Sequence, residues 1–313
     1  MISLGAHIVK AVLRLYTYPY RKRHASLSRS VKIKPGRDRI PDGFSWTVLE
    51  TGGGKAEILV PPAAPTDEAV VHFHGGGHTV GMNAMYRKVA ERYARGTGRT
   101  VISVDYRTGE DLIHPALLAD CFQTVMALKE AKKLPRKWVA AGDSMGANLL
   151  LAVCLKLRDC GEALPSAIVC VSPFVDLAAT GESYRKNAYA DPLYGLPKYQ
   201  KFSENEKFLR RKTPYIGEAD PKDPYLSPAY ADFTGFPPLL IQCGGCETSA
   251  SDADMLAVRA RDAGCDAALH VYDGLFHDFQ YLFPFLRESR RAWREIFLFL
   301  RLYLGMGAPD HTN

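Results

Sequence analysis

The stretch that decides the fold is residues 137–151, KWVAAGDSMGANLLL. A short apolar run ends at Gly142, the chain turns sharply around Ser144, and an apolar helical pattern follows from Ala147. Gly142 and Gly146 leave room for a tight turn, so the Ser144 hydroxyl is expected to stand exposed between strand and helix. The positive end of the helix then favours negative charge at Ser144. An ordinary Gly–Ser turn would give a similar pattern, so the stretch favours a serine nucleophile without establishing one.

The composition is that of a globular protein with a sizeable core. The chain has 313 residues, of which 47% are hydrophobic and 24% are charged. This length fits one large domain or two small ones. The formal net charge is +6, but Lys and Arg are spread along the chain, and the one basic block is residues 21–23. Nucleic-acid binding therefore has little support, and we interpret the charge as an aid to solubility.

The cysteine pattern favours a reducing compartment, which we take to be the cytoplasm. There are seven cysteines, an odd number, and most lie in apolar runs, as buried free thiols do. Cys243 and Cys246 have the spacing of a redox or metal motif, but neither a second pair nor a nearby histidine pair accompanies them. We therefore interpret this spacing as coincidental. The others are Cys121, Cys154, Cys160, Cys170 and Cys265.

The first 24 residues, MISLGAHIVKAVLRLYTYPYRKRH, predict a helix with one polar stripe. They lack the basic start and the small-residue cleavage site of a signal peptide, and polar residues interrupt them too often for a membrane span. A helix with so wide an apolar face can lie on a membrane surface. We expect it instead to cover an apolar pocket of its own chain. The polar residues are Ser3, His7, Lys10, Arg14, Thr17 and Arg21.

Beyond this helix, strands alternate with helices, which indicates a mostly parallel sheet covered on both faces. Residues 44–49 and 56–60 flank three glycines and predict a β-hairpin at a sheet edge. Residues 178–236 break the alternation, are rich in Tyr, Pro, Lys and Asp, and are too long for a bare loop, so we expect a helical insert. Further strands are expected at residues 69–73, 100–106, 138–141, 167–174, 237–243 and 267–272, and helices at residues 85–95, 117–132, 252–263 and 286–304.

Two further side chains suit a serine nucleophile, and each follows a predicted strand. His277 lies in the sequence GLFHDF, after a late strand, and Glu247 lies in CGGCE, after the strand before it. Open α/β sheets place their sites beyond the carboxyl ends of the strands, so both are expected near Ser144. A neutral histidine can take the serine proton, and a carboxylate can orient the histidine. Structural roles, as a loop histidine and a solvated carboxylate, remain the alternatives.

Four other carboxylates lie near Glu247 or His277 in the sequence. Two of them belong to the strand and loop that carry His277, where neighbouring side chains diverge from the ring. The other two fall at the start of the next helix, where carboxylates cap exposed N–H groups and suit the helix dipole. Glu247 is therefore the predicted acid. The first pair is Asp273 and Asp278, and the second pair is Asp252 and Asp254.

Three consecutive glycines after a buried strand form the second strong motif, in His74-Gly75-Gly76-Gly77. Their backbone N–H groups are unshielded, so Gly75 and Gly76, together with the N–H of Met145, are expected to form an oxyanion hole. One such donor contributes about 3 kcal/mol to the transition state. A phosphate-binding loop is the alternative, but the run lacks the G-x-G-x-x-G spacing and the Lys-Ser/Thr of a P-loop.

The histidines around this motif could suggest a metal site. His72 and His74 lie beside an apolar strand without an acidic partner at hand, and His78 follows the glycines. We therefore expect neither a metal nor another cofactor, and we expect His74 to brace the loop.

These motifs together resemble the hormone-sensitive-lipase-like group of α/β-hydrolases. The HGGG run stands about 70 positions before GDSMG, and a GLFHDF histidine follows. The resemblance covers about residues 45–300 and includes VDYR, PYLSP and FPP segments. It differs from the commoner pattern in having Glu247 where Asp is usual, and in Thr108-Gly109-Glu110 after Tyr106-Arg107.

The resemblance implies an α/β-hydrolase fold with a helical cap and a cofactor-free serine carboxylesterase. Ser144, Glu247 and His277 would be its triad, acting through an acyl-enzyme on short- to medium-chain esters, since a cap over the site limits acyl length. The expected partition is an N-terminal cap segment at 1–45, a catalytic domain at 46–177 and 237–313, and a cap insert at 178–236. An amidase or deacetylase, a non-catalytic ligand-binding protein and a membrane-associated lipase are the alternatives. The expected partner is a small-molecule ester, with no nucleic acid, and the protein is expected to be a monomer or homodimer.

Overall fold

The computed structural model describes residues 2–23, 40–202 and 214–306. Its centre is a sheet of eight strands in the order β1-β2-β4-β3-β5-β6-β7-β8. The first two strands run antiparallel to their neighbours, and the other strands are parallel. The strands are β1 (Ser45–Thr51), β2 (Gly54–Val60), β3 (Glu68–Phe73), β4 (Thr100–Tyr106), β5 (Lys137–Asp143), β6 (Ile168–Val171), β7 (Leu239–Gly244) and β8 (Ala267–Tyr272).

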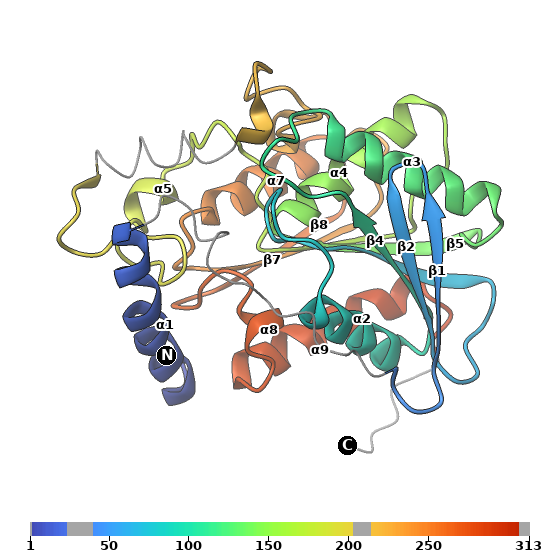
Figure 1. Ribbon diagram of the computed structural model, residues 1–313, viewed down its shortest axis with the longest axis horizontal. Coiled ribbons are helices and arrows are strands. Elements are labelled where there is room, and N and C mark those ends of the chain that lie inside the picture. Colours follow the sequence, from blue (N-terminus) through green and yellow to red (C-terminus); the bar gives the residue numbers. More distant parts are fainter. Residues whose placement is uncertain (1, 24–39, 203–213, 307–313) are drawn as a thin grey trace.

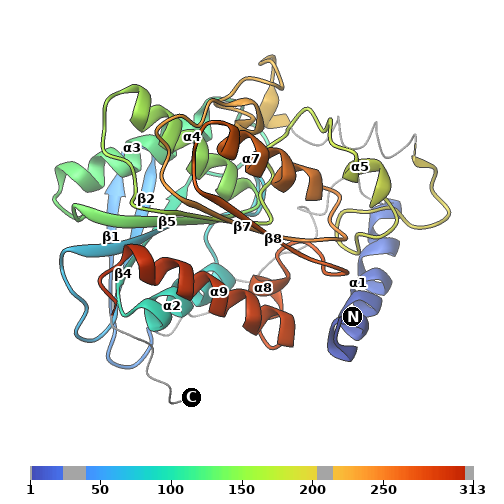
Figure 2. The same ribbon diagram turned by 180° about the vertical axis from the view of Figure 1, so that it is seen from behind.

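Helices cover both faces of the sheet, as the alternation predicts. In Figures 1 and 2, α3, α4 and α7 lie on one face, and α2, α8 and α9 lie on the other. The apolar core is divided by the sheet in the same way, with one large cluster under the first set and a smaller one under α2 and α9. The helices are α2 (Ala84–Thr97), α3 (Ala116–Glu130), α4 (Met145–Asp159), α7 (Ala250–Asp262), α8 (Phe279–Leu282) and α9 (Arg287–Tyr303).

The sheet confirms the predicted hairpin and explains the apolar strand sequences. Strands β1 and β2 pair in register with Trp46 opposite Leu59, and β1 forms the sheet edge. Every residue of β3 is buried, because helices cover both faces of the parallel strands. One strand is shorter than expected. Strand β6 ends at Val171 rather than at residue 174, because Ser172 has a φ of 44°, which extended strands do not adopt.

The insert is less helical than the sequence predicts in its described part. It contains one four-residue helix, α5 (Ser183–Lys186), and two 3₁₀ turns, η2 (Pro214–Ile216) and η3 (Pro228–Tyr230). Residues 203–213, which the same prediction included, lie outside the described residues. The segment around α5 is held in place by side chains, such as Ser183 and Asn187, that hydrogen-bond backbone groups of another loop. Helix formation contributes less to its structure.

The N-terminal helix α1 (Leu4–Arg23) packs beside α5 at the edge of the molecule in both views (Figures 1 and 2). The expected packing is only partly correct. Ala6, Val9 and Leu13 contact an apolar cluster around α8, as expected. However, the polar stripe also faces the protein: Lys10 Nζ donates to Gly274 O at 2.6 Å, and Thr17 Oγ1 donates to Pro192 O at 2.7 Å. None of the described helices combines the length and the apolar content needed to cross a membrane.

Candidate active site

Ser144 occupies the sharp turn between β5 and α4 that the sequence predicts. Its φ of 51° and ψ of −122° lie outside the usual regions for a residue with a side chain, which costs on the order of 1–3 kcal/mol. The neighbouring glycines make the turn possible. A Cβ on Gly142 would lie 2.8 Å from Gly146 O, and a Cβ on Gly146 would lie 2.3 Å from Phe73 O. Ser144 is 7% exposed, so only a small part of the residue reaches the surface at this turn.

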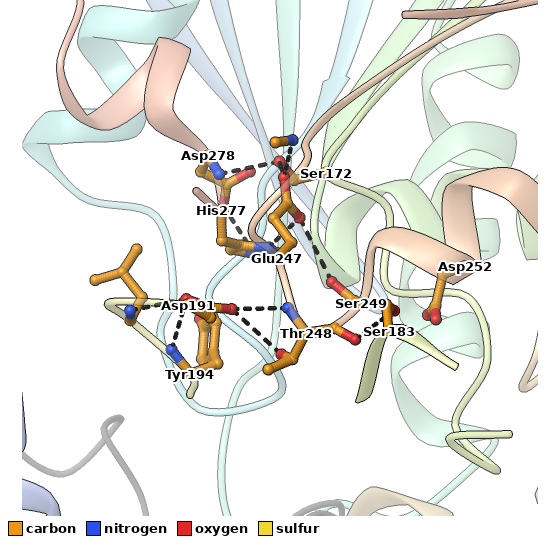
Figure 3. Close-up of polar contacts among 12 residues, drawn as sticks. Ser172, Ser183, Asp191, Tyr194, Glu247, Thr248, Ser249, Asp252, His277 and Asp278 are labelled. Atoms are coloured by element: carbon orange, nitrogen blue, oxygen red, sulfur yellow. Dashed lines mark hydrogen bonds and ion pairs between the residues drawn. The ribbon is translucent and has the colours of Figure 1, made fainter. Parts of the chain in front are cut away.

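Glu247 and His277 form a buried hydrogen-bonded pair beyond the ends of β7 and β8 (Figure 3). Glu247 Oε2 lies 3.0 Å from His277 Nδ1, and both side chains are almost fully buried. The other carboxylate oxygen accepts hydrogen bonds from Ser172 Oγ at 2.8 Å and from the Gly244 N–H. Ser172 Oγ also accepts the N–H of Asp278 at 3.0 Å, so one hydroxyl joins the acid loop to the histidine loop.

The side chain of Asp278 reaches the other nitrogen of the same ring. Asp278 Oδ2 lies 3.2 Å from His277 Nε2. This corrects the expectation that the two side chains diverge. Asp278 has a φ of 52°, and this left-handed turn folds its carboxylate back toward the ring. Sequence adjacency alone gives no sign of this contact, because it depends on the backbone conformation.

These carboxylates set the electrostatics of the site. Burial alone would lower the pKa of His277, but the charges of Asp278 and Glu247 outweigh it and raise this pKa well above the usual 6.5. Burial raises the pKa of Glu247, partly offset by its hydrogen bond to His277. His277 Nε2 makes no hydrogen bond within the described residues, so the structure contains no Ser144–His277 hydrogen bond.

Asp143, the last residue of β5, connects Ser144 to the glycine loop. Its Oδ1 accepts the Gly75 N–H at 3.0 Å, and its Oδ2 accepts the Tyr86 hydroxyl at 3.3 Å. Burial raises the pKa of Asp143 well above its usual range, and the negative charge of Asp278 adds to this, while His277 opposes it. The histidine loop lies beside the serine turn, because the Ser144 N–H donates to Val171 O at 2.9 Å and the next residue, Ser172, accepts the Asp278 N–H.

The contact with Asp143 also changes the expected oxyanion donors. The N–H of Gly75 is already used, so the prediction that it donates to an oxyanion is not supported by this structure. The N–H groups of Gly76 and Gly77 donate no hydrogen bond to any described residue. Met145 begins α4, so its N–H belongs to the first turn, where a helix offers no acceptor.

Known proteins with similar sequences and structures share this arrangement of elements. A family model for the alpha/beta hydrolase fold matches residues 70–281. An acetyl-hydrolase of Streptomyces hygroscopicus is 32% identical over 289 residues, covering 90% of this chain and 93% of its own. An esterase of Acinetobacter venetianus is 29% identical over 248 residues, covering 79% of each chain. The crystal structure of an esterase from the bacterial hormone-sensitive lipase family has a TM-score of 0.79 at 32% identity, over 97% of this chain and 99% of that one.

The chain belongs to the hormone-sensitive-lipase-like family of α/β-hydrolases. It is a carboxylic ester hydrolase. The fold and the family that the motifs predict are thereby confirmed.

His74 braces the glycine loop of the esterase, as expected. Its ring stacks on Tyr106 at 4.2 Å, and the Tyr106 hydroxyl donates to His74 O at 2.7 Å. The expectation that His72 and His74 lack acidic partners is wrong. His72 Nε2 lies 3.9 Å from Asp143 Oδ1, and His74 Nε2 lies 3.8 Å from Asp105 Oδ1. Burial lowers the pKa of His72 to about 3 and of His74 to about 4, so both rings are neutral at these contacts near neutral pH.

Asp252 has a role in the esterase that differs from the expected helix cap. Its Oδ2 accepts the N–H groups of Val175 and Asp176 at 2.9 and 3.0 Å, and the Tyr184 hydroxyl at 3.2 Å. These groups belong to the chain after β6 and to the insert, not to its own helix. Asp252 is fully buried and forms no hydrogen bond or ion pair with His277, so the structure brings Glu247, rather than Asp252, to the histidine.

Three side chains of the insert hold the acid loop of the esterase, and sequence reasoning missed all of them; Figure 3 shows two, Ser183 and Asp191. Asn187 Nδ2 donates to the carbonyl of Glu247 at 2.7 Å, and Ser183 Oγ donates to the carbonyl of Thr248, also at 2.7 Å. Asp191 Oδ2 accepts the Thr248 N–H at 2.9 Å. Polar residues in a Tyr- and Pro-rich segment are normally solvated, so only the fold reveals that these face the acid.

The second oxygen of Asp191 supports a turn that reaches His277. Asp191 Oδ1 accepts the N–H groups of Leu193 and Tyr194 at 2.8 and 3.0 Å. The Tyr194 ring packs edge-on against the His277 ring, with centroids 4.9 Å apart. One buried carboxylate thus fixes both the loop after Glu247 and an aromatic wall of the histidine.

Proposed function

We propose that the esterase uses Ser144, His277 and Glu247 as a catalytic triad that forms an acyl-enzyme. The observation that carries this proposal is the buried Glu247–His277 pair beside a strained serine turn. Glu247 holds Nδ1, so Nε2 is the nitrogen that takes the Ser144 proton while the oxygen attacks the ester carbonyl. The histidine then gives this proton to the leaving alcohol. Water, deprotonated by His277, adds to the acyl group and releases the acid.

The developing oxyanion is stabilised by backbone N–H groups of the glycine loop and α4. Gly76 and Met145 keep the roles that the sequence suggests. Gly77 takes the place of Gly75, whose N–H is held by Asp143. Asp143 then has a supporting function, because its hydrogen bond fixes the loop on which the donors stand. A Cβ on Gly75 would lie 2.2 Å from Asp143 Oδ2, so the two segments can approach only with glycine there.

The proposed substrates are short- to medium-chain esters. A cap formed by residues 1–45 and 178–236 limits the length of the acyl group, and the name of the Streptomyces relative points to acetyl groups. Amidase activity is the second candidate, because the same residues could cleave an amide. The proposed compartment is the cytoplasm, a reading supported by seven cysteines that are free thiols, five of them buried. The proposed oligomeric state is a monomer or a homodimer.

A substrate series tests these proposals directly. We expect purified protein to hydrolyse p-nitrophenyl esters fastest at short chain lengths and to act poorly on the matched anilides. Ser144→Ala should abolish this activity and leave the thermal unfolding midpoint close to that of the wild type. A fluorophosphonate probe should label Ser144 and no other residue. Labelling elsewhere, or an active Ser144→Ala variant, would contradict the mechanism.

A further inference from the structure

The outer side of α1 presents a continuous row of large apolar side chains. Because these residues recur at intervals of three and four, they lie on one side of the helix. A helix of a soluble domain normally turns such a row toward the core. This row, which we call the outer stripe, consists of Leu4 (76% exposed), Ile8 (56%), Val12 (56%), Leu15 (77%) and Tyr16 (77%).

Polar anchors keep the outer stripe facing away from the protein. Lys10 donates to Gly274 O, Arg14 Nη2 donates to Ala190 O at 2.9 Å, and Thr17 donates to Pro192 O. At the start of the helix, Ser3 is hydrogen-bonded to the Glu288 carboxylate. Rolling the helix to bury the stripe would break all of these bonds. The exposure is therefore enforced by the rest of the fold, and α1 stands at the edge of the molecule (Figures 1 and 2).

The positive charge of the chain is concentrated in the part of the sequence that contains α1. Residues 1–39 contain ten Lys and Arg and one Asp, which gives 10 − 1 = +9. The whole chain has 40 − 34 = +6, so residues 40–313 carry 30 − 33 = −3. Three of the basic residues, Arg21, Lys22 and Arg23, end α1 itself. Although Lys and Arg occur throughout the chain, the net charge is strongly positive in residues 1–39 and negative in residues 40–313.

We propose that the outer stripe of α1 docks on the surface of a bilayer that contains anionic lipids. Apolar side chains on one face of a helix enter the boundary between headgroups and acyl chains, and nearby basic residues attract anionic headgroups. A second copy of the chain is a poorer occupant, because a symmetric contact through α1 would bring two strongly positive segments together. The net negative charge of residues 40–313 favours an orientation in which the N-terminal part faces the lipid.

Vesicle flotation of the full-length protein tests this surface. We expect binding to phosphatidylcholine vesicles that contain phosphatidylglycerol, weaker binding as salt is raised, and little binding to phosphatidylcholine alone. Leu15→Ser should reduce the partition coefficient about tenfold. Leu302→Ser is the matched control, because Leu302 on α9 is 76% exposed but lies outside the stripe, and it should not change binding. Replacing Arg21, Lys22 and Arg23 with Gln should reduce binding to anionic vesicles about a hundredfold.

The remaining outcomes overturn the proposal. Thermal unfolding midpoints of the variants should match the wild type, since the substituted apolar side chains are exposed. Failure of the folded wild type to float with anionic vesicles would exclude a lipid surface, and so would equal losses for Leu15→Ser and Leu302→Ser. If sedimentation velocity shows a dimer that Leu15→Ser dissociates and Leu302→Ser does not, the stripe is a contact between copies. None of these results depends on ester hydrolysis, so they are independent of the proposed catalytic mechanism.

Discussion

The buried carboxylates around His277 differ in which ring nitrogen they reach. Glu247 holds Nδ1, which is the contact a catalytic acid must make to fix the ring and its tautomer. Asp278 faces Nε2, the nitrogen that takes the Ser144 proton in the proposed mechanism. The structure therefore places a carboxylate at the nitrogen to which Ser144 is proposed to donate its proton. Both charges favour the protonated ring, so removing either should change the turnover number or the pH dependence of the activity.

The Glu247 assignment predicts a large loss of turnover without a large loss of stability. Glu247→Gln keeps the size of the side chain but removes the charge and disturbs the tautomer of His277. We expect kcat to fall about 10⁴-fold, as in other Ser–His–acid triads. Asp252→Asn is the matched variant, since Asp252 is equally buried. It should keep most of its kcat and lose about 1–3 kcal/mol of unfolding free energy, because its acceptor serves Val175 and Asp176. The reverse pattern would make Asp252 the catalytic acid.

The raised pKa of His277 predicts an alkaline-shifted pH profile. Activity requires the neutral ring, and a raised pKa means that this form accumulates only above the usual histidine value of 6.5. The acid limb of kcat/KM should therefore lie above that pH. Asp278→Asn removes one charge and tolerates the left-handed backbone, so the limb should move toward lower pH. Asp273→Asn in the same loop should leave it in place. An unchanged limb in Asp278→Asn would show that Asp278 does not act on the ring.

At the scale of elements, the segment from α5 to Tyr194 is a support for the acid loop rather than a free-standing lid. Asn187 donates to the carbonyls of Gly245 and Glu247, and Asp191 accepts the Thr248 N–H. From the other direction, the Tyr184 hydroxyl donates to Asp252 on α7. These bonds are buried or partly buried, so each loss leaves an unpaired group. A cap that opens during turnover would therefore have to move elsewhere than at these contacts.

This support predicts a variant with lower turnover and an almost unchanged KM. In the wild type, one oxygen of Asp191 binds Thr248 and the other binds the turn at Tyr194. Asp191→Asn keeps only one acceptor oxygen, so either the Thr248 loop or the Tyr194 turn loses its partner and loosens. We expect kcat to fall about tenfold through imperfect placement of Glu247 and His277. Asp220→Asn is the control, because Asp220 accepts the Lys222 N–H in an exposed turn of the same insert. If kcat stays unchanged in Asp191→Asn, the carboxylate stabilises the insert alone.

At the scale of the whole molecule, α1 contacts the two loops that carry Glu247 and His277. Lys10 Nζ lies 2.6 Å from Gly274 O, in the histidine loop, and 3.3 Å from Cys246 Sγ, beside Glu247. We therefore expect Lys10→Met to lower kcat several-fold and to lower the thermal unfolding midpoint. Arg14→Met, which removes a contact to the insert at Ala190, should affect kcat less. Equal effects of the two variants would mean that α1 contributes only general stability.

The sequence alone determined the sheet, the serine turn and the Glu247–His277 pairing. These follow from local rules: glycines that a tight turn requires, apolar runs buried on both faces, and sites beyond the carboxyl ends of parallel strands. The fold class and the order Ser144, Glu247, His277 depend only on such short-range patterns.

Only the tertiary structure decided which groups those residues meet. Asp143 accepts the Gly75 N–H, and Asp191 accepts the Thr248 N–H. The carboxylate of Asp278 turns back to Nε2 of the neighbouring histidine. The spacing of residues in the sequence does not encode these contacts. The outward face of α1 was decided in the same way. The pattern of apolar and polar residues reveals two sides of a helix, but partners elsewhere in the fold determine which side is buried. In α1, the hydrogen bonds from Lys10, Arg14 and Thr17 outweigh the usual preference for burying apolar side chains.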